Sequence, residues 1–228
     1  MVLCWWEEGG RIVQKKNCRK ELIPYGDLYM KIAVIVPSYH EEGFLNQCLD
    51  SIEWAKTLCP CEVEVHVARD IKGIGRARNI GAANTSGEIL VFLDADCTMS
   101  RDFLLNVYEL AENWENVGGG VKWVHLDRYS LGTILSLVPV AIKLYWNQIT
   151  IGAFWVRREV FEKIGGFDDS TVHELDYDFA KRLRKQAMEW GRKFRSIKKA
   201  YIVWSTRGHK KYGEWYWLKG YKEFRSEI

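Results

Sequence analysis

The 228-residue chain lacks several features that mark particular protein classes, and each absence narrows the search. It has no low-complexity tract, and its 47% apolar and 28% charged residues are typical of a folded globular protein rather than a disordered or fibrous one. Its net charge of +3 is too small to indicate a nucleic-acid binder by itself. The length favours one domain, or one domain with an extension, and therefore a single active site.

Long apolar runs are also missing. The longest, from Leu131 to Trp146, contains Lys143 and is shorter than the roughly 20 residues that a membrane-spanning helix needs. No transmembrane helix is therefore predicted. A signal peptide is not expected either, because charged residues at positions 7, 8 and 11 interrupt the only early apolar stretch. We expect a cytoplasmic protein in a reducing environment.

Two short motifs are incomplete. Cys59 and Cys61 could hold a metal in principle, but no matched second pair or histidine accompanies them, which favours ordinary loop thiols. Gly73-Ile74-Gly75 begins a GxGxxG turn, but Arg78 stands where the third glycine is required. A Rossmann dinucleotide site is therefore not supported.

From residue 30 onward, strand-like and helix-like segments alternate. Continuous apolar runs at 32–36 and 89–93 predict strands buried on both faces, and alternation at 63–67 predicts a strand with one more exposed face. Apolar residues at helical spacing predict helices near 44–55, 76–83 and 103–111, the last with Ser100 as its N-cap. This alternation predicts an α/β fold with a mainly parallel central sheet flanked by helices.

The ends of the chain differ from this middle part. Residues 1–29 show neither helical nor strand periodicity over a useful length, so we expect an N-terminal extension followed by a domain at 30–210. Between residues 193 and 225, ten Lys or Arg alternate with aromatic residues, and residues 211–228 are assigned to a basic aromatic C-terminal segment. Such a surface suits an anionic membrane or a lipid-linked acceptor, although a solvated face with core aromatics explains it equally well. No nucleic-acid-binding motif is present.

Polar residues follow the predicted strands where ligands bind in parallel sheets, at the strand carboxyl ends. Asp94 and Asp96 come directly after the run at 89–93, and in an extended segment they present two carboxylates together with Ala95 turned aside. A hard cation takes one or two such carboxylates and completes its shell with substrate phosphates and water. The pair therefore predicts a Mg²⁺ or Mn²⁺ site that binds a diphosphate. The alternative is that the pair caps the next helix or forms a solvated turn.

Four segments, in order, resemble motifs of family 2 glycosyltransferases. They resemble VPxYNEE, GxxxARNxG, GEYxxFLDAD and GAxxxxRRExxxxxGGFDE, and they lie at residues 34–42, 73–81, 87–96 and 152–168. The resemblance covers about residues 31 to 210. It implies a GT-A fold, a nucleotide-diphospho-sugar donor bound at the strand ends, a divalent metal on the DxD carboxylates and inversion at the anomeric carbon.

The resemblance also assigns donor-binding positions. It places the nucleotide beside Pro37, Tyr39 and Glu41, the base beside Asp70, and the basic residue that precedes the glycine at Lys72. The sequence departs from the family here, since the usual DDGSxD segment is compressed into residues 68–72. The remaining donor-binding positions that it implies are Arg78, Asp94, Ala95, Asp96 and Arg207.

The second half of the domain is expected to build the acceptor side. His173 to Phe179 resembles the EDxDLxxRL segment, which places the general base at Asp176, with Glu174 as the competitor one residue of alignment away. His209, near the second basic position of an SxRR-like loop, is a candidate metal or diphosphate contact, or simply a solvated side chain.

The function that these observations predict is metal-dependent transfer of a sugar from a nucleotide-diphosphate donor to an acceptor hydroxyl by single displacement. The acceptor is a glycan, a protein or a lipid-linked molecule, with peripheral contact to a membrane and no nucleic-acid partner. Two alternatives stay open: a sugar-phosphate nucleotidyltransferase, and a non-catalytic module that binds nucleotide sugars or carbohydrates.

Overall fold

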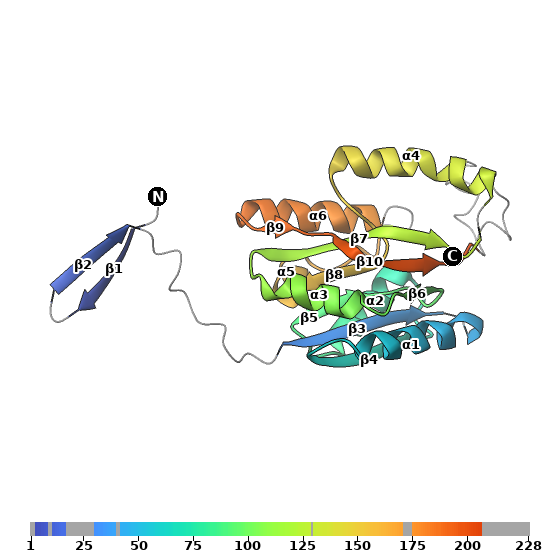
Figure 1. Ribbon diagram of the computed structural model, residues 1–228, viewed down its shortest axis with the longest axis horizontal. Helices are drawn as coiled ribbons and strands as arrows, with labels where there is room; N and C mark the ends of the chain where they lie inside the picture. The colour runs from blue at the N-terminus through green and yellow to red at the C-terminus, as the bar shows by residue number, and fades with distance from the viewer. Residues whose placement is uncertain are drawn as a thin grey trace.

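The computed structural model describes residues 3–8, 11–16, 30–39, 42–128, 130–170 and 175–206. An eight-stranded sheet with helices on both faces forms the domain, and a separate two-stranded sheet precedes it in the chain (Figure 1). The helices are α1 (Glu42–Lys56), α2 (Ile74–Ala83), α3 (Phe103–Glu112), α4 (Leu131–Asn147), α5 (Arg158–Lys163) and α6 (Leu175–Glu189). The strands of the large sheet are β3 (Lys31–Ser38), β4 (Glu62–Arg69), β5 (Ile89–Phe92), β6 (Cys97–Met99), β7 (Asn116–Leu126), β8 (Phe154–Arg157), β9 (Lys193–Phe194) and β10 (Ile197–Trp204).

The large sheet has the order β4-β3-β5-β8-β7-β10-β6, with β9 paired to β7. Strand β3 is parallel to both neighbours, β4 and β5, and β7 is parallel to β10 and β9. Strand β8 enters between β5 and β7 and runs antiparallel to both, and β6 is antiparallel to β10. The predicted α/β class is confirmed, and the sheet is parallel in its first half and mixed in its second.

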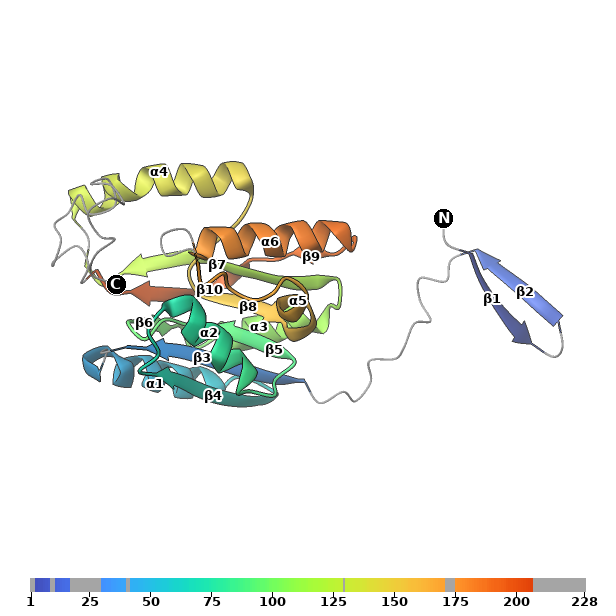
Figure 2. The same cartoon turned by 180° about the vertical axis from the view of Figure 1, so that it is seen from behind.

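Two cores lie on the two faces of this sheet. Helices α1 and α3 cover one face, and α2, α5 and α6 cover the other, as the two opposite views show (Figures 1 and 2). Strand β3 supplies both cores alternately, with Ile32, Val34 and Val36 in the first and Ala33 and Ile35 in the second. The expectation of a strand buried on both faces is thereby confirmed.

A cluster of phenylalanine rings fills part of the second core, near the carboxyl end of β5. Phe167 stacks on Phe179 with ring centroids 4.1 Å apart, and Phe92 meets Phe167 edge-on at 5.0 Å. Such contacts add about 0.5–1.5 kcal/mol each beyond the apolar area that they bury. The cluster fixes the segment around Phe167, which follows α5, against the end of β5.

The N-terminal residues form a hairpin, which the sequence analysis did not predict. Strand β1 (Leu3–Glu8) pairs antiparallel with β2 (Arg11–Lys16), from Leu3 opposite Lys16 to Glu8 opposite Arg11. The expectation that residues 1–29 lack strand structure was wrong for these twelve positions. The overlooked signal is the Gly9-Gly10 pair between the two runs, because two glycines suit the tight turn of a hairpin.

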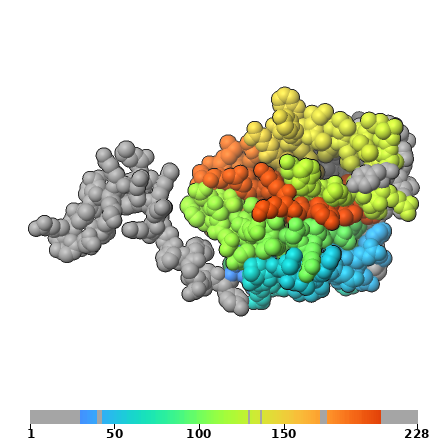
Figure 3. All heavy atoms as spheres, viewed as in Figure 1, coloured from blue at the N-terminus to red at the C-terminus, as the bar shows by residue number. Residues whose placement is uncertain are grey.

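The long apolar run of the second half forms helix α4, which lies as a ridge along the top of the domain in Figure 3. Ser130 caps its N-terminus, since the Ser130 hydroxyl accepts a hydrogen bond from the Thr133 N–H at 3.1 Å. Within the part of the chain that the structure describes, no helix has the length and apolarity needed to span a bilayer.

Candidate active site

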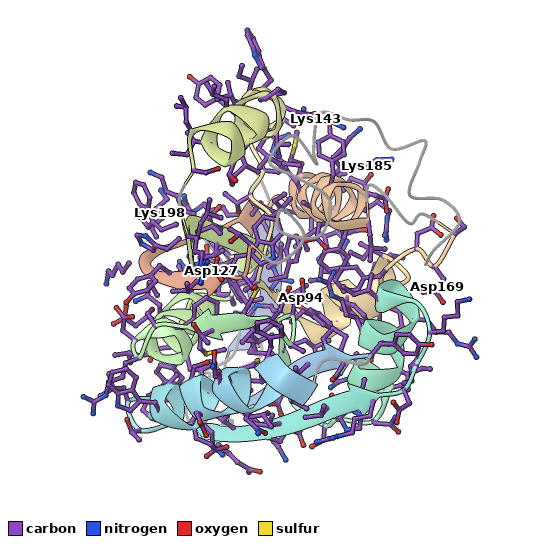
Figure 4. All side chains as sticks on the ribbon, turned by 90° about the vertical axis from the view of Figure 1, so that its right-hand side faces the viewer. Asp94, Asp127, Lys143, Asp169, Lys185 and Lys198 are labelled. Carbon is purple, nitrogen blue, oxygen red and sulfur yellow. The ribbon has the colours of Figure 1, made fainter. Side chains whose placement is uncertain are left out.

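The carboxyl ends of β3, β4 and β5 meet at one edge of the sheet, which faces the viewer in Figure 4. Pro37 and Ser38 end β3, Asp70 follows β4 and Asp94 follows β5. The Asp70 N–H donates to the Ser38 carbonyl at 3.1 Å, and Asp70 has a positive φ of 57°, so the chain turns sharply there. The structure therefore brings these predicted positions to a common edge.

The centre of this edge is the guanidinium of Arg78, on α2. Only 2% of Arg78 is exposed. One nitrogen donates to Asp94 Oδ1 at 2.7 Å and another to Asp176 Oδ1 at 2.6 Å. The guanidinium also lies 4.8 Å from the ring centroid of Phe167. Arg78 thus joins the end of β5 to the first turn of α6, although Asp176 is 98 residues away along the chain.

Burial and the neighbouring charges shift the pKa values of Asp176 and Arg78. Burial raises the pKa of Asp176 above its usual value, with a further contribution from Asp94, while Arg78 and the Gly152 N–H oppose the rise. Burial disfavours the charged form of Arg78, but the two carboxylates outweigh it and raise the Arg78 pKa. A carboxylate with a raised pKa is better matched to proton abstraction near neutral pH than an ordinary aspartate.

The aspartate pair does not lie in an extended segment, as the sequence analysis assumed. The Cys97 N–H donates to the Asp94 carbonyl at 2.9 Å, so residues 94–97 form a turn with Ala95 and Asp96 at its centre. Ala95 is buried in the core, whereas Asp94 and Asp96 are half-buried. The geometric reason given for the pair was therefore wrong.

The alternative role of the pair as a helix cap is contradicted. Helix α3 begins at Phe103 with Asp102 at its N-cap position, and neither Asp94 nor Asp96 is near enough in sequence to serve. Ser100 is not the N-cap either, because its hydroxyl instead donates to Asp102 Oδ1 at 2.6 Å. The other alternative, a turn, describes residues 94–97, and this turn lies at the strand edge where ligands bind in parallel sheets.

The two carboxylates fit a cation site that a donor completes. Among the described residues, no group of three or more His, Cys, Asp or Glu side chains could hold a metal ion. Asp94 and Asp96 match the one or two carboxylates that Mg²⁺ or Mn²⁺ uses when phosphates fill the remaining positions. The contact with Arg78 occupies one oxygen of Asp94, Oδ1.

The other predicted positions are either exposed at the strand ends or lie outside the described residues. Tyr39, Asp70 and Lys72 are exposed beside the strand ends. Four candidates lie outside the described part of the chain, so their placement stays a prediction: Glu41, Glu174, Arg207 and His209.

Several motif residues hold the site's loops instead of facing a ligand. Asn79 exchanges hydrogen bonds with Phe167, through its amide nitrogen to the carbonyl at 2.8 Å and its oxygen from the N–H at 2.9 Å. Arg158 donates to the main-chain carbonyls of Gly87 and Ala82, both at 2.8 Å. In the sequence, Asn79 and Arg158 appear only as motif letters. Their positioning role was missed because it depends on contacts about 70 to 90 residues apart.

Parts of this chain are similar in sequence to known glycosyltransferases. The sequence model of Glycosyl transferase family 2 matches residues 53–165. Glycosyltransferase AglE of Haloferax volcanii is 23% identical over 185 residues, covering 66% of this chain and 60% of that protein. Succinoglycan biosynthesis protein ExoW of Rhizobium meliloti is 25% identical over 59% of this chain and 57% of its own length. Glycosyltransferase GlyA of Streptococcus pneumoniae is 28% identical over 102 residues, which are 35% of this chain and 15% of GlyA.

Solved structures show the same fold. TarS of S. aureus aligns with a TM-score of 0.54 at 16% identity, over 77% of this chain and 60% of that one. A Drosophila β1,4-galactosyltransferase 7 mutant in complex with manganese, UDP-Gal and xylobiose aligns with a TM-score of 0.51 at 16% identity, over 74% of this chain and 64% of that one. The chain thus spans at most 60% of the length of these curated relatives, and its fold is of the GT-A type. The motifs, the fold and the family match together support a family 2 glycosyltransferase.

Proposed function

We propose that this domain transfers a sugar from a nucleotide-diphosphate donor to an acceptor hydroxyl. The observation that carries the proposal is the buried Arg78, which holds Asp94 at the end of β5 and Asp176 at the start of α6 at one strand edge. In open α/β sheets, ligands bind at this edge. Two structures of similar fold support a nucleotide-sugar donor, one in complex with UDP-Gal and one, a mannosyltransferase from Pyrobaculum calidifontis, with GDP-Man.

Asp94 and Asp96 would hold a divalent cation, Mn²⁺ or Mg²⁺, together with the donor diphosphate. When bound, the cation supplies Lewis-acid stabilisation of the charge that develops on the leaving diphosphate. Both structures of similar fold just named contain manganese, which supports this assignment. Pro37, Tyr39, Glu41 and Asp70 would surround the nucleotide. Lys72 and Arg207 would bind its phosphates, with His209 as a further contact.

Asp176 is the proposed general base. Its carboxylate would accept the proton of the acceptor hydroxyl while that oxygen attacks the anomeric carbon, which inverts the configuration at that carbon in a single displacement. The raised pKa of Asp176 suits this role, and the hydrogen bond from Arg78 fixes the orientation of the carboxylate. Glu174 is the alternative base.

Further assignments from the sequence stay part of this proposal. The catalytic domain would span residues 30–210, with an extension before it and a basic aromatic segment at 211–228 after it. The acceptor would be a glycan, a protein or a lipid-linked molecule on the cytoplasmic side of a membrane. A nucleotidyltransferase or a non-catalytic binding module would share the donor pocket, but neither needs a base directed at an acceptor hydroxyl.

Donor binding is tested by thermal unfolding with a panel of nucleoside diphosphates, with and without Mn²⁺. A ligand at 100 times its dissociation constant stabilises the folded state by about 2.7 kcal/mol, so one nucleotide should raise the melting temperature only with metal. Calorimetry on Asp96→Ala should show loss of the metal-dependent affinity with an unchanged fold. Asp50→Ala, an exposed aspartate on α1, is the matched control. Unchanged affinity in Asp96→Ala would remove Asp96 from the site.

Acceptor chemistry separates the enzyme from its two alternatives. Release of nucleoside diphosphate from a bound nucleotide sugar, as slow hydrolysis or as transfer to an added acceptor, is expected of a glycosyltransferase. A nucleotidyltransferase would instead release pyrophosphate from a nucleoside triphosphate and a sugar phosphate. Donor binding without any turnover would favour the non-catalytic module.

A further inference from the structure

Helix α4 presents an apolar stripe to solvent. Its outward side chains recur every three or four residues, which places them on one face of the helix. They are Leu131, Ile134, Leu135, Val138, Ile142, Tyr145 and Trp146. Three of them, Leu131, Tyr145 and Trp146, are 73%, 82% and 77% exposed. An apolar stripe of this length that stays uncovered on a folded domain marks an interaction surface.

The opposite face of α4 is anchored to the domain. Leu144 packs against the second core, and the ammonium of Lys143 lies 4.0 Å from the ring centroid of Tyr177 on α6. At the C-terminal end of the helix, Arg184 of α6 donates to the Gln148 side chain at 2.7 Å. These contacts hold the opposite face of α4 against the domain. The apolar stripe is therefore directed outward in the folded protein.

Basic residues flank the stripe, and α4 itself carries no acidic residue. Lys181 and Lys185 are exposed on α6, and Lys198 is exposed on β10. Lys185 and Lys198 lie on opposite sides of α4 in Figure 4. Lys185 is only loosely paired, with its ammonium 3.8 Å from the Glu189 carboxylate. An apolar ridge between two basic flanks is complementary to an anionic bilayer, whose headgroups attract lysines and whose interior accepts the apolar side chains.

A second copy of the chain fits this surface less well. Because both flanks are basic, a face-to-face pairing of two α4 ridges would bring lysines of one copy against lysines of the other. Tyr145 and Trp146, at the end of the stripe, are instead the residue types that gather at the headgroup level of membranes. The helix has 17 residues and does not reach across a bilayer, which suits an element lying in the interface.

We propose that α4 is a membrane-docking element that lies in the headgroup region of an anionic bilayer, with its apolar stripe toward the acyl chains. The first residue of α4 follows β7 at the strand edge where Asp94 lies, so a docked helix holds the site close to the lipid surface (Figures 1 and 4). The proposal stands on α4 and its flanks and does not depend on the reaction that the site performs.

The experiment is co-sedimentation of the full-length protein with vesicles of phosphatidylglycerol and phosphatidylcholine, compared with pure phosphatidylcholine. Wild-type protein should pellet with the anionic vesicles. Leu135→Glu should lower the partition coefficient about tenfold, because a charge replaces part of the buried apolar contact. Lys181→Gln with Lys185→Gln should lower it by a similar factor on anionic vesicles and leave weak binding to pure phosphatidylcholine unchanged.

Leu58→Glu is the matched control, since Leu58 is 39% exposed and Leu135 is 46% exposed, but Leu58 follows α1 on the other side of the domain. It should bind vesicles as the wild type does, and equal melting temperatures would show that both variants fold. Wild-type protein that stays in the supernatant, or Leu135→Glu that pellets normally, overturns the proposal. A dimer in light scattering that Leu135→Glu dissociates, without vesicle binding, would assign the stripe to a second copy. Nucleotide binding measured on the same samples tests the proposed function separately.

Discussion

Replacing Arg78 with methionine should destabilise the domain strongly at neutral pH. Methionine keeps much of the length and packing of the arginine but removes both ion pairs, at 2.6 Å to Asp176 and 2.7 Å to Asp94. Two carboxylates that shared one buried guanidinium would then face each other without a cation. Removing one partner of a buried ion pair costs about 3–5 kcal/mol, which is a large part of the roughly 5–15 kcal/mol that stabilises a typical domain.

The pH dependence of this loss identifies its cause. In the wild type, Arg78 opposes the rise in the Asp176 pKa that burial and Asp94 cause. Without Arg78, the folded-state pKa of Asp176 rises further above its unfolded value. A carboxylate whose folded-state pKa is raised above its unfolded value destabilises the fold at pH values above both. This cost disappears as the pH falls from the folded-state pKa to the unfolded value, because the carboxyl then becomes protonated. The loss of stability relative to the wild type should therefore be smaller at pH 5 than at pH 7.

Urea unfolding of wild type and Arg78→Met at pH 7 and pH 5 measures both effects. The exposed ion pair between Lys199 and Glu109, at 3.0 Å, supplies the control, because Lys199→Met should change the free energy of unfolding by only about 0–1 kcal/mol. A loss below about 1 kcal/mol in Arg78→Met, or a loss of equal size at both pH values, would refute the argument from buried charge.

Three further predictions concern the base, the extension and the packing of the sheet. Asp176→Asn should slow the chemical step in single-turnover assays about 10²- to 10⁴-fold with little change in donor affinity, whereas a loss confined to Glu174→Gln would move the base. A chain that starts at Met30 should fold and keep donor binding, because the large sheet begins after it; insoluble protein would show that the extension packs on the domain. Gly87→Ala should lower the midpoint of urea unfolding, because its Cβ would lie 2.6 Å from a main-chain nitrogen of β3, while Gly43→Ala, with nothing within 4 Å, should leave it unchanged or raise it. Equal midpoints for the two alanine variants would contradict the close approach at Gly87.

The sequence predicted local structure best where a residue pattern fits only one kind of structure. The runs that became β3 and β5 are apolar throughout because both faces of the sheet are covered, and this shows directly in the sequence. The Gly9-Gly10 pair between β1 and β2 was an equally local signal and could have predicted the hairpin. The turn at Asp94 and Asp96 could not, because the same three letters fit an extended segment as well as a turn.

The strand directions in the second half of the sheet could not be predicted, because they depend on strands that are distant in the sequence. Strand β8 runs antiparallel to β5 and β7, a direction that four residues of sequence do not encode. Its register is set by the strands on either side. The same is true of Arg158, whose bonds to Gly87 and Ala82 hold a turn more than 70 residues away.

The sequence by itself determined the α/β class, the buried strands and the resemblance to family 2 glycosyltransferases, because these depend on local periodicity and on short ordered motifs. Only the tertiary structure showed that Arg78 joins Asp94 to Asp176, and that the apolar stripe of α4 faces outward. Both depend on which distant surfaces pack together. A buried arginine and an exposed apolar helix face run against the usual hydrophobic pattern, and their partners are set by the fold rather than by sequence neighbours.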